Sequence, residues 1–249
     1  MNKQLTLTVK NLEVKIENKL ILHKVDISLK AGEFHVVMGP NGSGKSTLTY
    51  ALMGHPSYKV TGGVMKLGSV NLINLEPHER AKLGIMLAFQ NPVAIPGVTV
   101  SNFLRTSYRE LYGKESSDVL TFHKHLMEVA RMLEVDQTFL RRGINDGFSG
   151  GEKKKLEMLT LIILKPKFAI FDEIDTGLDV DALKVVASGI DTLHQNGTGI
   201  LLITHYRRIL TYVNPQFVHV MIEGEIVRRG GTEIVEQIEE FGYANIHRI

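Results

Sequence analysis

The sequence predicts an α/β fold with a parallel core sheet, an antiparallel β part near the N-terminus, and a helical insert. Its 249 residues and hydrophobic fraction of 43% are enough for one large domain with a buried core. From residue 34 onward, apolar runs of strand length are followed by helical patterns, which indicates parallel strands joined by crossover helices. We expect the core and the antiparallel part in residues 1–90 and 165–249, and the helical insert at about residues 91–164.

The first part of the chain starts with strand signals. Apolar residues recur at every second position over Leu5–Ile16 and Ile21–Leu29, which is typical of antiparallel strands with one face in water. Phe34–Met38 is more uniformly apolar, as in a fully buried strand, and Gly62-Gly63 is expected to separate two short strands. The elements predicted here are strands at residues 5–16, 21–29, 34–38, 64–67, 70–73 and 85–89 and helices at residues 48–53 and 77–83.

The second part contains two successive amphipathic helices, predicted at residues 100–112 and 118–133, before the alternation resumes. We expect Asn91–Gly97 and Gly113–Ser117 to be loops, with Ser117 or Asp118 as the N-cap of the second helix. The elements predicted after these are helices at residues 150–164, 180–193 and 232–241, a short helix after His205, and strands at residues 168–171, 199–203, 217–222 and 224–229.

Composition excludes several classes of function. Lys and Arg number 29 against 27 Asp and Glu, so no overall field favours nucleic acid or an anionic membrane. The absence of cysteine excludes disulfides, thiolate zinc sites and thiolate-held iron–sulfur clusters within this chain. The longest apolar candidate, Leu159–Leu164, is too short to span a membrane, and no signal peptide is recognisable. We therefore expect a cytoplasmic protein without direct membrane insertion and without a nucleic-acid partner.

A glycine-rich stretch lies between the buried strand at residues 34–38 and the helix that follows it. It fits the pattern G-x-x-x-x-G-K-[ST], in which backbone N–H groups and a helix N-terminus surround phosphates. Lys45 would reach the β- and γ-phosphates, and the Ser46 hydroxyl would hold Mg²⁺. The predicted phosphate-binding residues are Gly39, Pro40, Asn41, Gly42, Ser43, Gly44, Lys45, Ser46 and Thr47.

Polar residues follow three other predicted strands. Asp172 and Glu173 close the run 168–171, where two buried acids are costly unless a positive group is near. Alone, such a pair more often caps a helix or faces solvent. Beside a phosphate loop, Asp172 would act on the metal's shell, and Glu173 would orient or deprotonate the attacking water. Because the carboxyl ends of parallel strands share one edge, Gln90 and His205 are expected at the same site.

Gln90 and His205 are weak signals individually. An amide at a strand end usually makes loop hydrogen bonds, and a histidine there is usually satisfied by its surroundings. Together with the phosphate loop, the His205 ring could donate to the γ-phosphate and stabilise charge as the bond breaks. The predicted catalytic residues are Glu173, His205 and Lys45.

Ser149-Gly150-Gly151-Glu152 allows two interpretations that do not exclude each other. Ser149 and Glu152 have the spacing of a capping box at a helix start. The two glycines disfavour the first helical turn by roughly 1 kcal/mol each, and they leave bare N–H groups that could bind an anion. The sequence thus contains a second candidate phosphate-binding helix end.

These motifs, in this order, resemble the ATP-binding cassette (ABC) family of P-loop ATPases over essentially the whole chain. The corresponding stretches are Gly39–Thr47 (Walker A), Gln90 (Q-loop), Phe148–Glu152 (signature), Phe168–Glu173 (Walker B and catalytic glutamate), Asp175–Asp179 (D-loop) and His205 (switch histidine). The resemblance implies ATP and Mg²⁺ as cofactors, with Ser46, Gln90 and Asp172 at the metal and with Gln90, Ser149, Gly150 and Gly151 at the nucleotide. It also implies an ATP-dependent homodimer in which the signature of one subunit meets the Walker A of the other.

Within the family, the chain is most similar to the SufC group, the ATPases of the SUF iron–sulfur cluster assembly system. The similar stretches are Gly54–Tyr58, Val60–Gly63, Ser149–Lys155, Asp172–Leu183, Thr204–Tyr206 and Glu240–Tyr243. Ile174-Asp175 and Glu152 stand where transporter ATPases more usually have Pro-Thr and a glutamine. Two features depart from related proteins: Ile16 stands at the position of an adenine-stacking aromatic, and Lys155 stands where Arg is frequent. We expect Lys153–Lys155 to form a solvated first helical turn.

The leading hypothesis is an ATPase that powers a SUF-type assembly complex, with SufB- and SufD-like scaffold proteins as partners. The helical insert and the Gln90 loop would transmit the motion to them. The alternatives are the nucleotide-binding subunit of a membrane transporter and an ATP-gated interaction protein that does not hydrolyse ATP.

Overall fold

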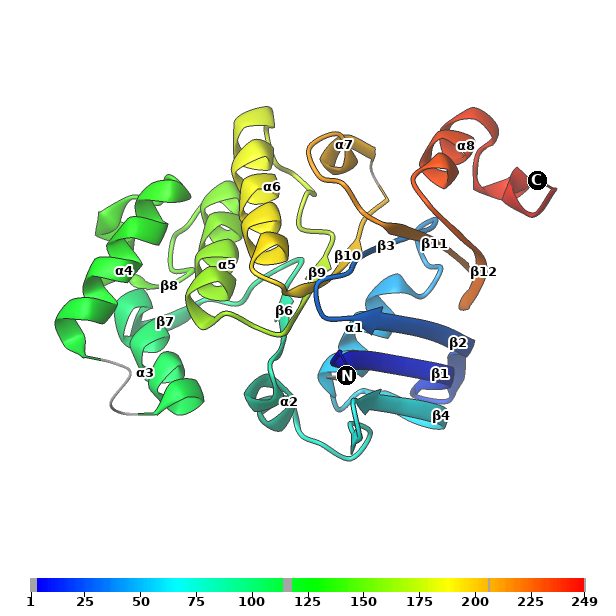
Figure 1. Cartoon of the computed structure of the whole chain (residues 1–249), viewed down its shortest axis with the longest axis horizontal. Helices are drawn as coiled ribbons and strands as arrows, with labels where there is room; N and C mark the ends of the chain where they lie inside the picture. Colours follow the sequence, from blue (N-terminus) through cyan, green and yellow to red (C-terminus); the bar gives the residue numbers. More distant parts are fainter. Residues whose placement is uncertain (1–3, 114–117, 206, 249) are drawn as a thin grey trace.

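The computed structural model describes residues 4–113, 118–205 and 207–248, so Ser117 and Tyr206 lie outside the described residues. The predicted α/β class is confirmed: a core sheet, an antiparallel sheet and a group of helices lie side by side (Figure 1). The core sheet has the order β12-β11-β3-β10-β9-β6, and all its neighbours are parallel except β11 and β12. Its strands are β3 Phe34–Met38, β6 Ile85–Ala88, β9 Phe168–Asp172, β10 Gly199–Ile203, β11 Phe217–Ile222 and β12 Glu225–Gly230.

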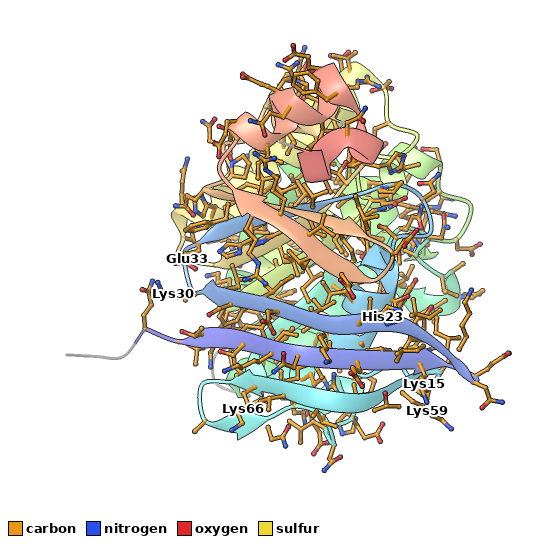
Figure 2. All side chains as sticks on the ribbon, turned by 90° about the vertical axis from the view of Figure 1, so that its right-hand side faces the viewer. Lys15, His23, Lys30, Glu33, Lys59 and Lys66 are labelled. Atoms are coloured by element: carbon orange, nitrogen blue, oxygen red, sulfur yellow. The ribbon has the colours of Figure 1, made fainter. Side chains whose placement is uncertain are left out.

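The antiparallel sheet has the order β2-β1-β4-β5 and packs below the core sheet, with β2 next to β12 (Figure 2). Its strands are β1 Thr6–Ile16, β2 Lys19–Lys30, β4 Tyr58–Leu67 and β5 Val70–Asn71. The prediction that Gly62-Gly63 separates two strands is wrong, because both glycines lie inside β4. A β-bulge between β1 and β4 explains them: a Cβ on Gly63 would lie 2.3 Å from the carbonyl oxygen of Asn11.

Helices cover both faces of the core sheet and form the insert. The core helices are α1 Lys45–Met53, α2 Pro77–Leu83, α6 Val180–Gln195, α7 Arg207–Leu210, α8 Glu233–Phe241 and η3 Tyr243–Arg248. Helix α5 Gly150–Leu164 ends the predicted insert and contacts α3 and α4 of the insert as well as α6 and β6 of the core. The insert contains α3 Val100–Tyr112, α4 Val119–Met132, η2 Gln137–Arg141 and a two-stranded ladder, β7 Ile95–Thr99 with β8 Gly143–Ile144. Asp118 caps α4 by accepting the Thr121 N–H at 3.0 Å. Among the described residues, no helix is both long and apolar enough to cross a bilayer.

Two hydrophobic cores sandwich the core sheet. Along β3, Val36 packs into the core on the side of α5 and α6, and Val37 packs into the core shared with the antiparallel sheet. The central strands β3, β9 and β10 are therefore buried on both faces, as their uniform apolarity predicted. Since β3, β6, β9 and β10 run parallel, their carboxyl ends lie at one edge, and the residues that follow them form the candidate site.

Candidate active site

The phosphate loop, residues 39–47, connects β3 to α1. Gly44 precedes α1 with a φ of 103°, a left-handed conformation that favours glycine. A Cβ on Gly39 would lie 2.1 Å from the carbonyl oxygen of Met221, so only glycine fits between the loop and β11. The start of α1 has no side-chain cap and no acidic residue in its first turn. Its N–H groups are thus available to an anion, as the sequence predicted.

Lys45 lies within this loop and is only 4% exposed. Its ammonium donates to the carbonyl oxygens of Gly39 at 2.9 Å and Pro40 at 3.0 Å. Burial lowers the pKa of Lys45, and the nearby carboxylates of Glu173 and Asp172 offset part of that effect. A bound phosphate would give this buried charge the anionic partner that two neutral carbonyls do not provide.

Asp172, at the end of β9, faces the first turns of α1. Its carboxylate accepts from the Ser46 hydroxyl at 3.2 Å and from the Thr49 hydroxyl at 3.1 Å. Burial raises the pKa of Asp172, and the charge of Glu173 raises it further. A divalent cation would favour the charged form, and hydroxyl and carboxylate oxygens are ligands that suit Mg²⁺. Ser46 and Asp172 therefore fit the predicted metal site.

Glu173 lies where three strand ends meet. Its carboxylate accepts from the Gln90 amide at 2.7 Å, and Nδ1 of His205 lies 3.4 Å from its other oxygen. Its backbone has a φ of 48°, which is rare for a residue other than glycine and turns the chain directly after β9. The structure thus brings together Gln90, Glu173 and His205 as the parallel topology predicted. The Gln90 amide is directed to Glu173, not to Asp172, so its predicted role at the metal stays a prediction.

Asp175 extends the polar cluster. Thr204, fully buried, donates its hydroxyl to one carboxylate oxygen of Asp175 at 2.8 Å. The other oxygen is buried and has no hydrogen-bond partner among the described residues. Burial raises the pKa of Asp175. Asp172, Glu173 and Asp175 are thus three buried carboxylates within four residues at the end of β9.

The capping box of α5 is present. Ser149 Oγ accepts the Glu152 N–H at 3.3 Å, and the Glu152 carboxylate accepts the Ser149 N–H at 2.6 Å. A Cβ at Gly150 would meet no atom within 4 Å, so the start of α5 is open to its surroundings. The capping interpretation is confirmed, and the role of Ser149, Gly150 and Gly151 as a second phosphate site stays a prediction.

The prediction that Lys153–Lys155 are all solvated is wrong for Lys154. This side chain is 4% exposed, and its ammonium donates to the carbonyl oxygens of Phe89 at 2.9 Å and Gln90 at 2.5 Å. Burial lowers the pKa of Lys154. The signal for its burial was present in the sequence: Lys154 precedes Met158 and Leu161 at the four- and seven-residue spacing of one helix face.

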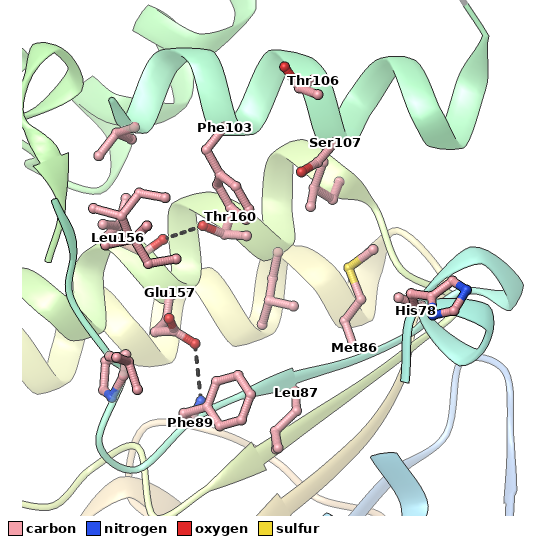
Figure 3. A pocket seen from close by; sticks show the side chains of 18 of the residues that line it. His78, Met86, Leu87, Phe89, Phe103, Thr106, Ser107, Leu156, Glu157 and Thr160 are labelled. Atoms are coloured by element: carbon pink, nitrogen blue, oxygen red, sulfur yellow. Dashed lines mark hydrogen bonds between the residues drawn. The ribbon is translucent and has the colours of Figure 1, made fainter. Parts of the chain in front are cut away.

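Glu157, one turn further along α5, also contacts the loop after β6. Its carboxylate accepts the Phe89 N–H at 3.0 Å. Burial raises the pKa of Glu157 to about 7, and the Phe89 N–H and Lys154 limit the increase. Glu157 lines a cavity of about 670 Å³ between α2, α3, α5 and β6, next to Phe89 (Figure 3). Neither Lys154 nor Glu157 was expected to contact the Gln90 loop.

The described residues contain no cluster of three or more His, Cys, Asp or Glu side chains that would hold a metal ion by itself. A metal site here would need ligands from the substrate's phosphates, as is usual for Mg²⁺ in nucleotide sites.

Ile16, the residue at the predicted adenine-stacking position, ends β1 and is half-buried opposite Tyr58.

A family model described as "ABC transporter" matches residues 22–176, a range that includes the phosphate loop, Gln90, Ser149 and Glu173. The chain belongs to the ABC transporter family. Relatives in this family align along nearly their full length. "Probable ATP-dependent transporter ycf16" of Antithamnion sp. is 45% identical over 251 residues, covering 100% of both chains. "Vegetative protein 296" of Bacillus subtilis is 49% identical over 240 residues, covering 96% of this chain and 92% of that one.

Solved ABC structures share the fold. The ATP-binding subunit of an ABC transporter superposes with a TM-score of 0.80 at 22% identity, covering 96% of this chain and 98% of that one. A dimeric ATP-binding cassette bound to ADP and Pi superposes with a TM-score of 0.77 at 22% identity, covering 90% of this chain and 98% of that one. These likenesses confirm the predicted ABC ATPase fold, with its helices and its antiparallel β part.

Proposed function

We propose that this chain hydrolyses ATP with Mg²⁺ and uses the reaction to drive a conformational change in a partner complex. The observation that carries the proposal is the position of Glu173, which is held between Gln90 and His205 at the edge of the sheet where the phosphate loop begins. A carboxylate oriented by two polar side chains beside a phosphate site is suited to orient and deprotonate the attacking water.

The residues of the loop divide the work. Backbone N–H groups at the start of α1 bind the phosphates, and Lys45 exchanges its two carbonyl partners for phosphate oxygens. Ser46 and Asp172 would hold Mg²⁺, which would neutralise phosphate charge when it is bound. His205 stabilises the charge that develops on the γ-phosphate.

We further propose that two copies close around ATP. The start of α5, with Ser149, Gly150 and Gly151, is open and offers bare N–H groups. In a two-fold dimer, this helix end of one subunit would complete the phosphate site of the other. A dimeric solved relative with a similar fold supports this arrangement.

For the partner, we propose a SUF-type assembly complex with SufB- and SufD-like scaffolds and a cytoplasmic location. The support is the sequence resemblance in Ser149–Lys155 and Asp172–Leu183. The cavity beside Phe89 and the exposed side chain of Val93 place an apolar surface next to the Gln90 loop, where a partner would influence Glu173. The second candidate is a membrane transporter, favoured by relatives whose names describe ATP-dependent transporters.

A pull-down distinguishes the two candidates. Tagged protein is recovered from the supernatant and from the detergent-extracted membranes of its own host, and co-purifying proteins are identified by mass spectrometry. Scaffold proteins of the SufB and SufD type in the supernatant would support the assembly role. A polytopic membrane protein would move the function to transport and leave the ATPase chemistry in place. An untagged lysate serves as the control for non-specific capture.

A further inference from the structure

The loop that carries Gln90 is held by side chains of α5. Lys154 donates to two consecutive carbonyl oxygens, those of Phe89 and Gln90, and Glu157 accepts the N–H of Phe89. All three hydrogen bonds go to backbone atoms of two adjacent residues. Such contacts fix the path of the backbone whatever side chains the loop carries.

The two α5 residues point to the loop from one helix face, because they are three residues apart. Figure 3 shows Glu157 directed from α5 to the backbone nitrogen of Phe89, with the cavity on the side of α3. Lys154 also lies near the negative charges of Glu157, Asp172, Asp175 and Glu173, which favour its charged form against burial. We call these two side chains the clamp: the buried ammonium of Lys154 donates to two backbone carbonyls, and the carboxylate of Glu157 accepts a backbone N–H.

The next link leads to the reacting centre. The Gln90 side chain donates to Glu173 at 2.7 Å, and its backbone carbonyl is the acceptor for Lys154. A shift of this backbone would therefore move the amide that contacts the proposed catalytic base. Ser149 caps the start of α5 at Gly150, so the proposed dimer-closing end lies only one to two turns before Lys154 and Glu157 on the same helix.

We propose that Lys154 and Glu157 are positioning residues: they clamp the backbone at Phe89 and Gln90, and through Gln90 they set the orientation of Glu173 for hydrolysis. This inference rests on the proposed ATPase function and deepens it. Neither side chain touches the reacting atoms; both act on the reaction through the loop.

The test compares Glu157→Leu, Glu157→Gln and Thr160→Val. Leucine removes the acceptor and keeps a similar volume, and glutamine keeps an oxygen that can accept the Phe89 N–H. Thr160 lines the same cavity, but its hydroxyl donates to Leu156 within α5, so Thr160→Val is the matched control. Steady-state ATP turnover gives kcat and KM, and hydrogen exchange with mass spectrometry follows the amides of residues 85–95.

We expect Glu157→Leu to lower kcat about tenfold with KM for ATP within about twofold, since the phosphate loop is untouched. Its residues 85–95 should exchange about tenfold faster, with Glu157→Gln and Thr160→Val close to wild type on both measures. Wild-type kcat in Glu157→Leu, or unchanged exchange at residues 85–95, would overturn the proposal. Absence of turnover in the wild type would instead refute the ATPase function, and the exchange measurement would still decide whether the clamp exists.

Discussion

A buried histidine pair makes the protein sensitive to acid. His35 on β3 and His219 on the neighbouring strand β11 lie side by side, with Nδ1 of His35 3.0 Å from Nε2 of His219. The other nitrogen of His35 lies 3.3 Å from the Glu33 carboxylate, which also pairs with Lys30 (Figure 2). Burial lowers the pKa of His219 from 6.5 to about 3, and the neighbouring His35 and Arg229 contribute.

The sign and size of the effect follow from that difference. Because the folded state binds the His219 proton more weakly than the unfolded state does, the stabilising effect is complete above about pH 6.5 and is lost as the pH falls toward 3. Lowering the pH from 7.5 to 5.0 takes it about 1.5 units below the unfolded-state pKa of 6.5, which lowers the free energy of unfolding by about 2 kcal/mol. The pKa of His35 is also lowered, because burial outweighs the opposing effect of Glu33. Protonation of His35 therefore also destabilises the folded state as the pH falls.

Urea unfolding of wild type and His219→Gln at the two pH values measures this contribution. Glutamine can still donate to His35 but cannot be protonated. We expect wild type to lose about 2 kcal/mol more than the variant between pH 7.5 and 5.0. His123→Gln, at an exposed position of α4, should behave as wild type. Equal losses in wild type and His219→Gln would refute the reasoning.

Three further substitutions test the site and its supports. Glu173→Gln should reduce ATP turnover at least 100-fold, measured by phosphate release, and retention of turnover would exclude Glu173 as the base. Gly224→Ala should lower the free energy of unfolding by at least about 2 kcal/mol more than the control Gly97→Ala. A Cβ on Gly224 would lie 2.0 Å from the carbonyl oxygen of Ile21, whereas a Cβ on Gly97 would meet no atom within 4 Å. Arg80→Met should lower the free energy of unfolding in urea by about 2–4 kcal/mol, because the buried guanidinium donates to the carbonyl oxygens of Ala51 and Leu52 at 2.7 and 2.8 Å. A loss below about 1 kcal/mol would show that water takes over these hydrogen bonds in the variant.

Elements with strong local signals were predicted from the sequence alone. Pro77 and Gly84 predicted a helix over residues 77–83, and α2 has these bounds in the structure. The amphipathic pattern gave Val100–Tyr112, and uniformly apolar runs gave β3, β10 and β11. These elements are determined by residues near one another in the chain, so periodicity and punctuation were sufficient.

Other features depend on distant partners. The bulge that places Gly62-Gly63 inside β4 exists because of β1, and the short β7 forms only by pairing with β8. The helical spacing of Lys154 indicated a buried helix face, but its hydrogen-bond partners are carbonyls about 64 residues away in the chain and could not be read from that spacing. The left-handed backbone of Glu173 has no local sequence signal. The sequence therefore predicted that Gln90, Glu173 and His205 would meet, and the tertiary structure was needed to show that Lys154 and Glu157 hold the Gln90 loop.

ATP-dependent association of Glu173→Gln tests the central claim most directly. The variant should bind Mg²⁺ and ATP without turnover, so the closed state should accumulate. Sedimentation velocity with and without Mg²⁺-ATP gives the mass, and 27.8 kDa is the mass of one chain. The proposed function predicts a mass of one chain without nucleotide and of two chains with it, and a further change Ser149→Arg at the open start of α5 should prevent association. A single-chain mass at saturating ATP would contradict the proposed clamp of two subunits around the nucleotide.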